Sequence, residues 1–126
     1  MRAFRILVVD DEVEFTTFLA KVLRKRGFDV TVANDGAGAL ARIGDERFDA
    51  VLLDVKMPDL DGLATLARIK RTAPQTPVIL LTGHLSPTEE QDGLRRGAEA
   101  YLLKPHPIAD LVARLEAAAR GHGAGG

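Results

Sequence analysis

The sequence has no cysteine and no tryptophan, and only one tyrosine and five phenylalanines among its 126 residues. Without cysteine there can be no disulfide, thiolate metal site or thiol nucleophile, and a reducing compartment is expected. The longest aliphatic runs, such as Ile6–Val9 and Val78–Leu81, are four residues long, whereas a transmembrane helix needs about 20. We therefore expect no membrane contact, no secretory signal and a cytoplasmic location.

The chain also lacks an excess of charge of either sign, because 17 basic and 18 acidic side chains leave a net charge of -1. This balance gives no electrostatic reason to expect direct binding to nucleic acid or to an anionic membrane. The content of 12 glycines and 6 prolines is too low for a low-complexity chain. We predict one domain over residues 1–120, followed by a flexible glycine-rich tail over residues 121–126.

Short apolar runs alternate with helical patterns along the chain. The expected strands are 5–9, 28–33, 48–53, 77–81 and 100–103, and the expected helices are 12–26, 36–44, 62–71, 86–96 and 108–120. The first, third and fourth strands have no polar face, as expected when helices cover both sides of a parallel sheet. The sequence therefore predicts an α/β fold with a doubly wound five-stranded parallel sheet of order 2-1-3-4-5, a flavodoxin-like (βα)5 architecture.

Acidic residues follow the first and third of these strands. In this topology the ligand crevice lies at the carboxyl ends of those strands, where Asp10, Asp11 and Asp54 would meet. Carboxylates about 5 Å apart repel by about 3 kcal/mol per pair at an effective dielectric of 20, so their gathering implies a cation. Oxygen ligands alone suit Mg²⁺ best and Mn²⁺ next, and no histidine or cysteine cluster indicates zinc.

Each acid taken singly also has a structural interpretation. Asp11 followed by Glu14 fits a helix N-cap with an acid at the third helical position, and Asp54 can open a turn before residues 57–59. On fold rules alone a structural role is about as common as a functional one. The convergence of three acids on one crevice favours function.

The fourth and fifth strands end in a hydroxyl and an ammonium. Thr82-Gly83 offers a hydrogen-bond donor and room for close approach, and Lys104 offers a compact partner for a phosphate. A threonine at a sheet edge and a solvated lysine are common in their own right. Together with the acids, however, they form a set suited to handling a phosphoryl group with a metal ion.

Four segments resemble the receiver domain of two-component response regulators of the stand-alone chemotaxis-regulator type. These segments are Asp10-Asp11-Glu12, Leu52–Gly62, Thr82-Gly83 and Gly97–Pro105. They stand in the family's order at the ends of the expected strands, and the similarity runs from residue 5 to about residue 120.

The resemblance implies that Asp54 is the phosphoacceptor, which takes a phosphoryl group from a histidine kinase or a histidine phosphotransfer protein. It implies direct binding of Mg²⁺ by Asp11 and Asp54, a largely water-mediated contact by Asp10, and a further ligand in the backbone carbonyl of Lys56. A phospho-accepting signalling domain is implied rather than a turnover enzyme, with self-catalysed dephosphorylation left open.

The resemblance also implies a conformational switch. Thr82 and Lys104 would contact the phosphoryl oxygens, and Tyr101 would follow Thr82 inward as an aromatic switch. The face formed by helix four, strand five and helix five would carry the signal to an output partner that the sequence does not identify, and a homodimer through helices four and five stays open. A cis peptide bond is expected before Pro105, although only about 5–6% of such bonds are cis.

The kinase is expected to meet the first helix at Thr16, Thr17 and Ala20, together with the loop after strand five. That loop departs from the family pattern, because His106 and Pro107 stand where a large apolar residue and then a polar one are usual. We therefore expect an unusual entry into the last helix.

Two other classes of protein remain as alternatives. A phosphatase of the haloacid dehalogenase type also uses an aspartate nucleophile, but it needs a second aspartate where this chain has Lys56. A flavodoxin-like binding module would cradle the phosphate of a flavin after strand one, where Asp10-Asp11-Glu12 would repel it.

Overall fold

The computed structural model describes residues 3–59, 61–84 and 86–125. Leu60 of the Leu52–Gly62 segment and Gly126 of the predicted tail lie outside the described residues. Among the described residues, no helix is both long and apolar enough to cross a membrane.

Within the described part of the chain, five parallel strands alternate with five helices, as predicted. The strands are β1 (Arg5–Val9), β2 (Asp29–Ala33), β3 (Ala50–Asp54), β4 (Val78–Thr82) and β5 (Ala100–Leu103), and the helices are α1 (Val13–Lys25), α2 (Gly36–Asp45), α3 (Gly62–Thr72), α4 (Pro87–Arg95) and α5 (Ile108–Gly125). The strands pair in the order β2-β1-β3-β4-β5. This arrangement confirms the predicted doubly wound sheet.

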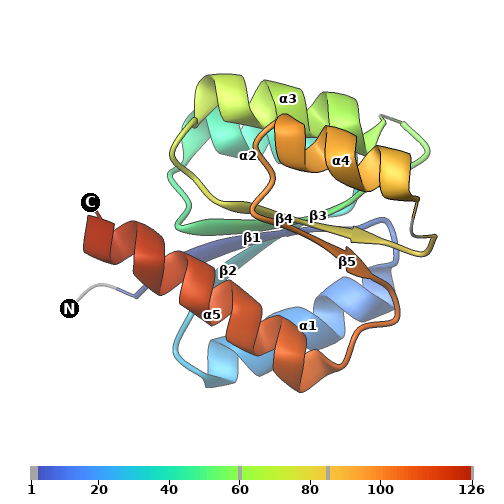
Figure 1. Cartoon of the computed structure of the whole chain (residues 1–126). Helices are drawn as coiled ribbons and strands as arrows, with labels where there is room; N and C mark the ends of the chain where they lie inside the picture. Colours follow the sequence, from blue (N-terminus) through green and yellow to red (C-terminus); the bar gives the residue numbers. More distant parts are fainter. Residues whose placement is uncertain (1–2, 60, 85, 126) are drawn as a thin grey trace.

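Helices cover both faces of the sheet (Figure 1), with α2, α3 and α4 on one side and α1 and α5 on the other. Alternate residues of each strand supply the two cores, because successive side chains in a strand point to opposite faces. Leu7 and Val9 of β1 pack on the α2–α3 side, whereas Ile6 and Val8 pack on the α1–α5 side. Strands β3 and β4 are buried along their whole length, which explains why their sequences show no polar face.

Glycine, serine and proline residues mark the ends of several elements. Gly27, which follows α1, has a φ of 94°, a left-handed conformation that favours glycine. Ser86 caps α4 by accepting a hydrogen bond from the Glu89 amide at 3.4 Å, with Pro87 in the first turn. The bond between Lys104 and Pro105 is cis, as the resemblance implied.

Two boundaries differ from the prediction by more than one residue. Strand β3 begins at Ala50 rather than at residue 48 and includes Asp54 as its last residue. Helix α5 continues to Gly125, past the predicted end at residue 120, because glycine lowers helix stability by only about 1 kcal/mol per position and does not forbid helical dihedrals. The flexibility of residues 121–126 stays a prediction.

Candidate functional site

Three aspartates meet at the carboxyl ends of β1 and β3, where the topology predicted a crevice. Carboxylate oxygens of Asp10, Asp11 and Asp54 all lie within 4.8 Å of one another. Asp10 and Asp54 are buried, with 1% and 6% of their surface exposed, whereas Asp11 is open to solvent. An all-oxygen cluster with one solvent-facing member fits a hard divalent cation such as Mg²⁺.

Burial and mutual repulsion disfavour the ionised form of the clustered carboxylates. The pKa of Asp54 is raised to about 7, first by its burial and then by the charge of Asp10. The backbone amide of Lys56, which donates to Asp54 at 3.2 Å, and the charge of Lys104 act in the opposite direction. A bound cation would relieve this repulsion, because it favours the ionised form of the carboxylates.

Lys104 reaches the cluster from the end of β5. Its Nζ donates to a carboxylate oxygen of Asp10 at 2.8 Å and pairs with Glu12 as well. The same Nζ lies 4.8 Å from the centre of the Phe15 ring, a cation–π distance. Burial opposes the charged form of Lys104, yet Asp10 and Glu12 outweigh it and raise the pKa of this amine. The lysine therefore stays protonated beside the acids.

Thr82 is the last residue of β4 and is fully buried. Its hydroxyl donates to the carbonyl of His84 at 3.1 Å and accepts from the His84 amide at 3.2 Å. The hydroxyl therefore holds the loop after β4 close to the strand end. It lies at the same edge of the sheet as Asp54, whose Cα pairs with that of Leu81 in the adjoining strand.

Tyr101 of β5 is buried and points toward α4. Its hydroxyl donates to the carboxylate of Glu89 at 3.1 Å. Burial first, and then Glu89, raise the pKa of Tyr101, while Thr82 acts in the opposite direction. The Glu89 amide donates to the Ser86 cap, whereas the Glu89 carboxylate accepts from the tyrosine. Thr82, Tyr101 and α4 thus form one connected group behind the crevice.

The loop between β3 and α3 folds back tightly beside Asp54. The amide of Gly62 donates to the Val55 carbonyl at 2.8 Å, and Lys56 forms an antiparallel bridge with Asp61. A Cβ at position 62 would stand closer than 3.0 Å to three backbone atoms of Val55, so only glycine permits this approach. The loop thereby fixes the backbone of Lys56, whose carbonyl is a predicted metal ligand.

Of the two structural interpretations of the acids, the helix cap at Asp11 is wrong and the turn at Asp54 is confirmed. The N-cap predicted for Asp11 is wrong, because Glu12 occupies that position and makes no side-chain cap. Asp54 does accept from the Lys56 amide, as an aspartate in a turn would, while it also faces Asp10. A turn-forming contact and a place in the cluster therefore coexist at Asp54.

Two of the helix residues expected to face a kinase are not on the surface. Thr16 is buried, and its hydroxyl donates to the Val13 carbonyl and accepts from Asn34. Ala20 packs into the α1–α5 core. Only Thr17 is exposed as expected. The helix instead exposes two apolar residues, Val13 at 59% and Phe18 at 53%.

Sequence reasoning missed several residues that complete the site. Glu12 and Phe15 contact Lys104, although the sequence indicated Glu12 only as part of a motif and gave no role to Phe15. Asn34 donates to the carbonyl of Asp10 at 2.8 Å. At the entry to α5 the Leu111 amide donates to the Pro107 carbonyl at 3.0 Å, whereas the buried Nε2 of His106 has no hydrogen-bond partner among the described residues.

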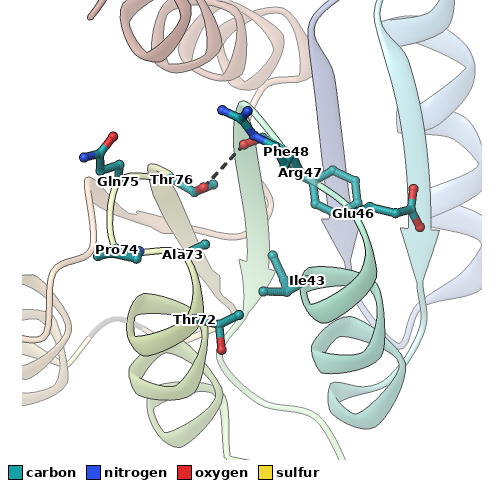
Figure 2. A pocket seen from close by; sticks show the side chains of 9 residues that line it. All are labelled: Ile43, Glu46, Arg47, Phe48, Thr72, Ala73, Pro74, Gln75 and Thr76. Carbon is teal, nitrogen blue, oxygen red and sulfur yellow. Dashed lines mark hydrogen bonds between the residues drawn. The ribbon is translucent and has the colours of Figure 1, made fainter. Parts of the chain in front are cut away.

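A pocket of about 300 Å³ lies at the opposite end of the sheet (Figure 2), between the segments that precede β3 and β4. Its lining includes Phe48, Pro74 and Thr76, and the Thr76 hydroxyl donates to the Phe48 carbonyl. Its acidic member, Glu46, already pairs with Arg5 and Arg42. None of the predicted site residues borders this pocket, so it is separate from the acidic cluster.

Comparison with known proteins agrees with this geometry. The family model described as response regulator receiver domain matches residues 6–116. The transcriptional regulatory protein PrrA of Mycobacterium leprae is 41% identical over 95% of this chain and 52% of its own length. The transcriptional regulatory protein ZraR of Escherichia coli is 42% identical over 90% of this chain and 26% of its own length. The chain thus spans about a quarter to a half of these curated relatives.

Solved structures show the same likeness. A CheY-like response regulator receiver domain protein from Methanospirillum hungatei superposes with a TM-score of 0.94 at 30% identity, over 98% of this chain and 99% of that chain. A response regulator from Burkholderia pseudomallei with a phosphorylated aspartic acid, a calcium ion and citrate gives a TM-score of 0.84 at 30% identity, over 96% and 71% of the two chains. The chain belongs to the receiver domain family of two-component response regulators, a family of signal-transduction domains.

Proposed function

We propose that the chain is a phospho-accepting switch in which Asp54 receives a phosphoryl group from a histidine kinase or a histidine phosphotransfer protein. The observation that carries the proposal is the meeting of Asp10, Asp11 and Asp54 within 4.8 Å at one strand edge, with Lys104 in contact with Asp10. The Burkholderia relative, which holds a phosphorylated aspartate and a calcium ion, supports this chemistry.

In the proposed transfer, a carboxylate oxygen of Asp54 attacks the phosphorus of a phosphohistidine. An oxygen–phosphorus bond forms as the phosphorus–nitrogen bond breaks, and the electron pair of that bond leaves with the imidazole nitrogen of the partner. The product on this chain is an acyl phosphate. Only the ionised carboxylate is a nucleophile, so neighbours that favour ionisation of Asp54 promote the reaction.

The acidic cluster fits Mg²⁺, with Mn²⁺ as a second choice. Asp11 and Asp54 would hold the ion directly, Asp10 largely through water, and the Lys56 carbonyl would add a backbone ligand. When bound, the ion supplies positive charge to the phosphoryl oxygens during an in-line transfer. The tight turn between Val55 and Gly62 supports this assignment, because it fixes the Lys56 backbone beside Asp54.

Lys104 and Thr82 would act on the phosphoryl group once it is attached. The ammonium of Lys104 is already held over the cluster by Asp10 and Glu12, from which it can turn to phosphoryl oxygens that carry more charge. The Thr82 hydroxyl would exchange its loop contacts with His84 for a phosphoryl oxygen and draw the loop after β4 inward.

The signal would leave through the α4–β5–α5 face. Tyr101 connects β5 to α4 through Glu89 and lies beside Thr82, so movement of the threonine reaches that face through the tyrosine. An output partner, or a second copy of the chain joined through α4 and α5, would read the change. We assign the chain no direct contact with nucleic acid, because its charge is balanced.

The phosphodonor would dock near the cluster, on α1 and the loop after β5. The exposed apolar side chains of Val13 and Phe18, with Thr17 between them, replace Thr16 and Ala20 as the expected contacts. Apolar residues ringed by polar ones are typical of protein-binding surfaces. In this role the chain is a signalling domain rather than a turnover enzyme, and slow self-catalysed loss of the phosphoryl group is compatible with it.

Intact mass measurement after incubation with a small acyl-phosphate donor and Mg²⁺ tests the proposal. We expect one added phosphoryl group on the wild type, none on Asp54→Ala, and none on the wild type when a chelator replaces Mg²⁺. Asp45→Asn, which changes an exposed aspartate at the end of α2, is the matched control and should accept the group normally. An unmodified wild type, or an equally modified Asp54→Ala, would refute the assignment.

A further inference from the structure

The turn between β2 and α2 contacts the loop that carries Asp10. The amide of Asp10 donates to the Ala33 carbonyl at 3.2 Å, and the Asn34 side chain donates to the Asp10 carbonyl at 2.8 Å. The same amide group of Asn34 reaches the Thr16 hydroxyl of α1 at 3.1 Å. The first acidic loop is therefore tied on both sides of Asp10 to residues 33 and 34.

The same turn also holds the loop after β3. The carboxylate of Asp59 accepts from the amides of Gly36 and Ala37, one oxygen to each, at 3.0 and 3.1 Å. These amides are the first of α2, where free N–H groups and the positive end of the helix dipole favour a carboxylate. Asp59 thus caps a helix that lies more than 20 residues earlier in the chain.

Asp59 belongs to the loop whose backbone bears Lys56. That loop is closed by the Gly62–Val55 hydrogen bond and by the bridge between Lys56 and Asp61. Because these contacts join the two ends of the loop, a shift of Asp59 would reach the Lys56 carbonyl and the amide that holds Asp54. The α2 N-terminus is therefore mechanically connected to the phosphoacceptor.

We propose that the contacts of Asn34 and Asp59 with the β2–α2 turn form a bracket that sets the spacing between the two loops of the metal site, with these two side chains as its positioning residues. The inference rests on the proposed function, since it concerns the Mg²⁺ site of that function. Neither residue touches the cation in this scheme. Asn34 fixes the backbone of Asp10, and Asp59 fixes the loop of Lys56 against the same turn.

Simple helix capping is the competing explanation for the contacts of Asp59. A comparison with Asp35 distinguishes capping from the bracket. The carboxylate of Asp35 also caps α2, by accepting from the Gly38 amide at 2.6 Å, but this bond stays within the β2–α2 segment. Loss of either cap should cost about 1 kcal/mol of stability. Only loss of Asp59 releases the loop after β3.

Mg²⁺ titration of the whole chain, followed by amide NMR shifts well below the unfolding temperature, tests the bracket. We expect Asp59→Ala and Asn34→Ala each to weaken Mg²⁺ binding about tenfold, in line with other residues that orient metal ligands. The double variant should be no more than about twofold weaker than the worse single variant, because either change opens the bracket. Asp35→Ala should bind Mg²⁺ as the wild type does. Asp59→Asn, which keeps an acceptor oxygen, should recover part of the affinity.

The outcomes separate the bracket from the function beneath it. Wild-type Mg²⁺ affinity in Asp59→Ala or in Asn34→Ala, with only a lower unfolding temperature, would reduce these residues to stabilising contacts and overturn the bracket alone. Equal weakening by Asp35→Ala would also overturn it, since capping would then explain the effect. A wild type that fails to bind Mg²⁺ at all would remove both the bracket and the proposed function.

Discussion

The ammonium of Lys104 lies 2.8 Å from a carboxylate oxygen of Asp10, although the two residues are 94 positions apart in the chain. Asp10 is 1% exposed and Lys104 is 16% exposed at the side chain, so the pair is largely shielded from water. Among the residues that the structure describes, this lysine is the cation that pairs with the acidic cluster. Its removal should therefore expose the repulsion between Asp10 and Asp54.

We expect Lys104→Met to lower the free energy of unfolding of the metal-free protein by about 1 to 3 kcal/mol, because it leaves a buried carboxylate without its partner. Methionine is also unbranched but carries no charge, so it removes the ion pairs with Asp10 and Glu12 and the cation–π contact with Phe15. Urea unfolding in a chelator measures the loss, and saturating Mg²⁺ should recover most of it. Lys21→Met, at an exposed position of α1, serves as the control, and equal stability of the two variants would contradict the prediction.

The pKa of Asp54, about 7 in the folded metal-free chain, predicts an unusual dependence of stability on pH. An aspartate in an unfolded chain titrates near about 3.9. Between about pH 4 and about pH 7 the unfolded state has lost this proton while the folded state retains it, so stability falls as the pH rises through this range. We expect Asp54→Asn, which cannot ionise, to exceed the wild type by about 1 to 3 kcal/mol above that range and to match it at low pH.

Urea unfolding of both proteins across this pH range, in a chelator, measures the difference. Mg²⁺ should abolish the advantage of Asp54→Asn at high pH, because the cation compensates the wild-type carboxylates. Asp45→Asn removes an exposed aspartate and should show no such advantage at any pH. If the wild type is as stable as Asp54→Asn in the chelator at high pH, then ionised Asp54 does not destabilise the fold.

The fold and the position of the acids could be predicted because both depend on local sequence. Apolar runs without a polar face mark buried parallel strands, and strand order then determines which strand ends meet. Asp10, Asp11, Asp54 and Lys104 all follow from this logic, and the structure places them at one edge. The functional roles of these residues came from the resemblance rather than from spacing.

Contacts between distant segments could not be predicted in this way. Val13 and Phe18 are apolar residues of a helix, and yet both are exposed. Whether an apolar helix residue is covered depends on which helices pack beside it. The pairing of Glu12 with Lys104 and the cap that Asp59 supplies to α2 join residues far apart in sequence. Side-chain reach of this kind leaves no periodic signal.

Tyr101 is the only tyrosine in a chain without tryptophan, so its ionisation can be followed directly by phenolate absorbance. Burial, and then Glu89, raise the pKa of Tyr101. We expect the measured pKa to lie above its ordinary value of about 10 and to fall in Glu89→Gln, which removes the negative charge beside the hydroxyl. Glu90→Gln is the matched control and should lower the pKa less, because the charge of Glu90 raises the pKa of Tyr101 less than Glu89 does. Unchanged titration in Glu89→Gln would contradict the hydrogen bond between β5 and α4.

The closure of the loop beside Asp54 depends on the missing side chain of Gly62. We expect Gly62→Ala to lower the free energy of unfolding by about 3 kcal/mol, because the new Cβ would press on the backbone of Val55 rather than on a movable side chain. Gly44→Ala is the matched control, since that glycine lies in α2 with nothing within 4 Å of an added Cβ, and alanine should stabilise the helix there by about 0.5 to 1 kcal/mol. Urea unfolding measures both changes. Opposite signs at the two glycines would show that the loop is held by close backbone contact, whereas a neutral Gly62→Ala would show that the loop can relax and that the Lys56 carbonyl is not rigidly placed.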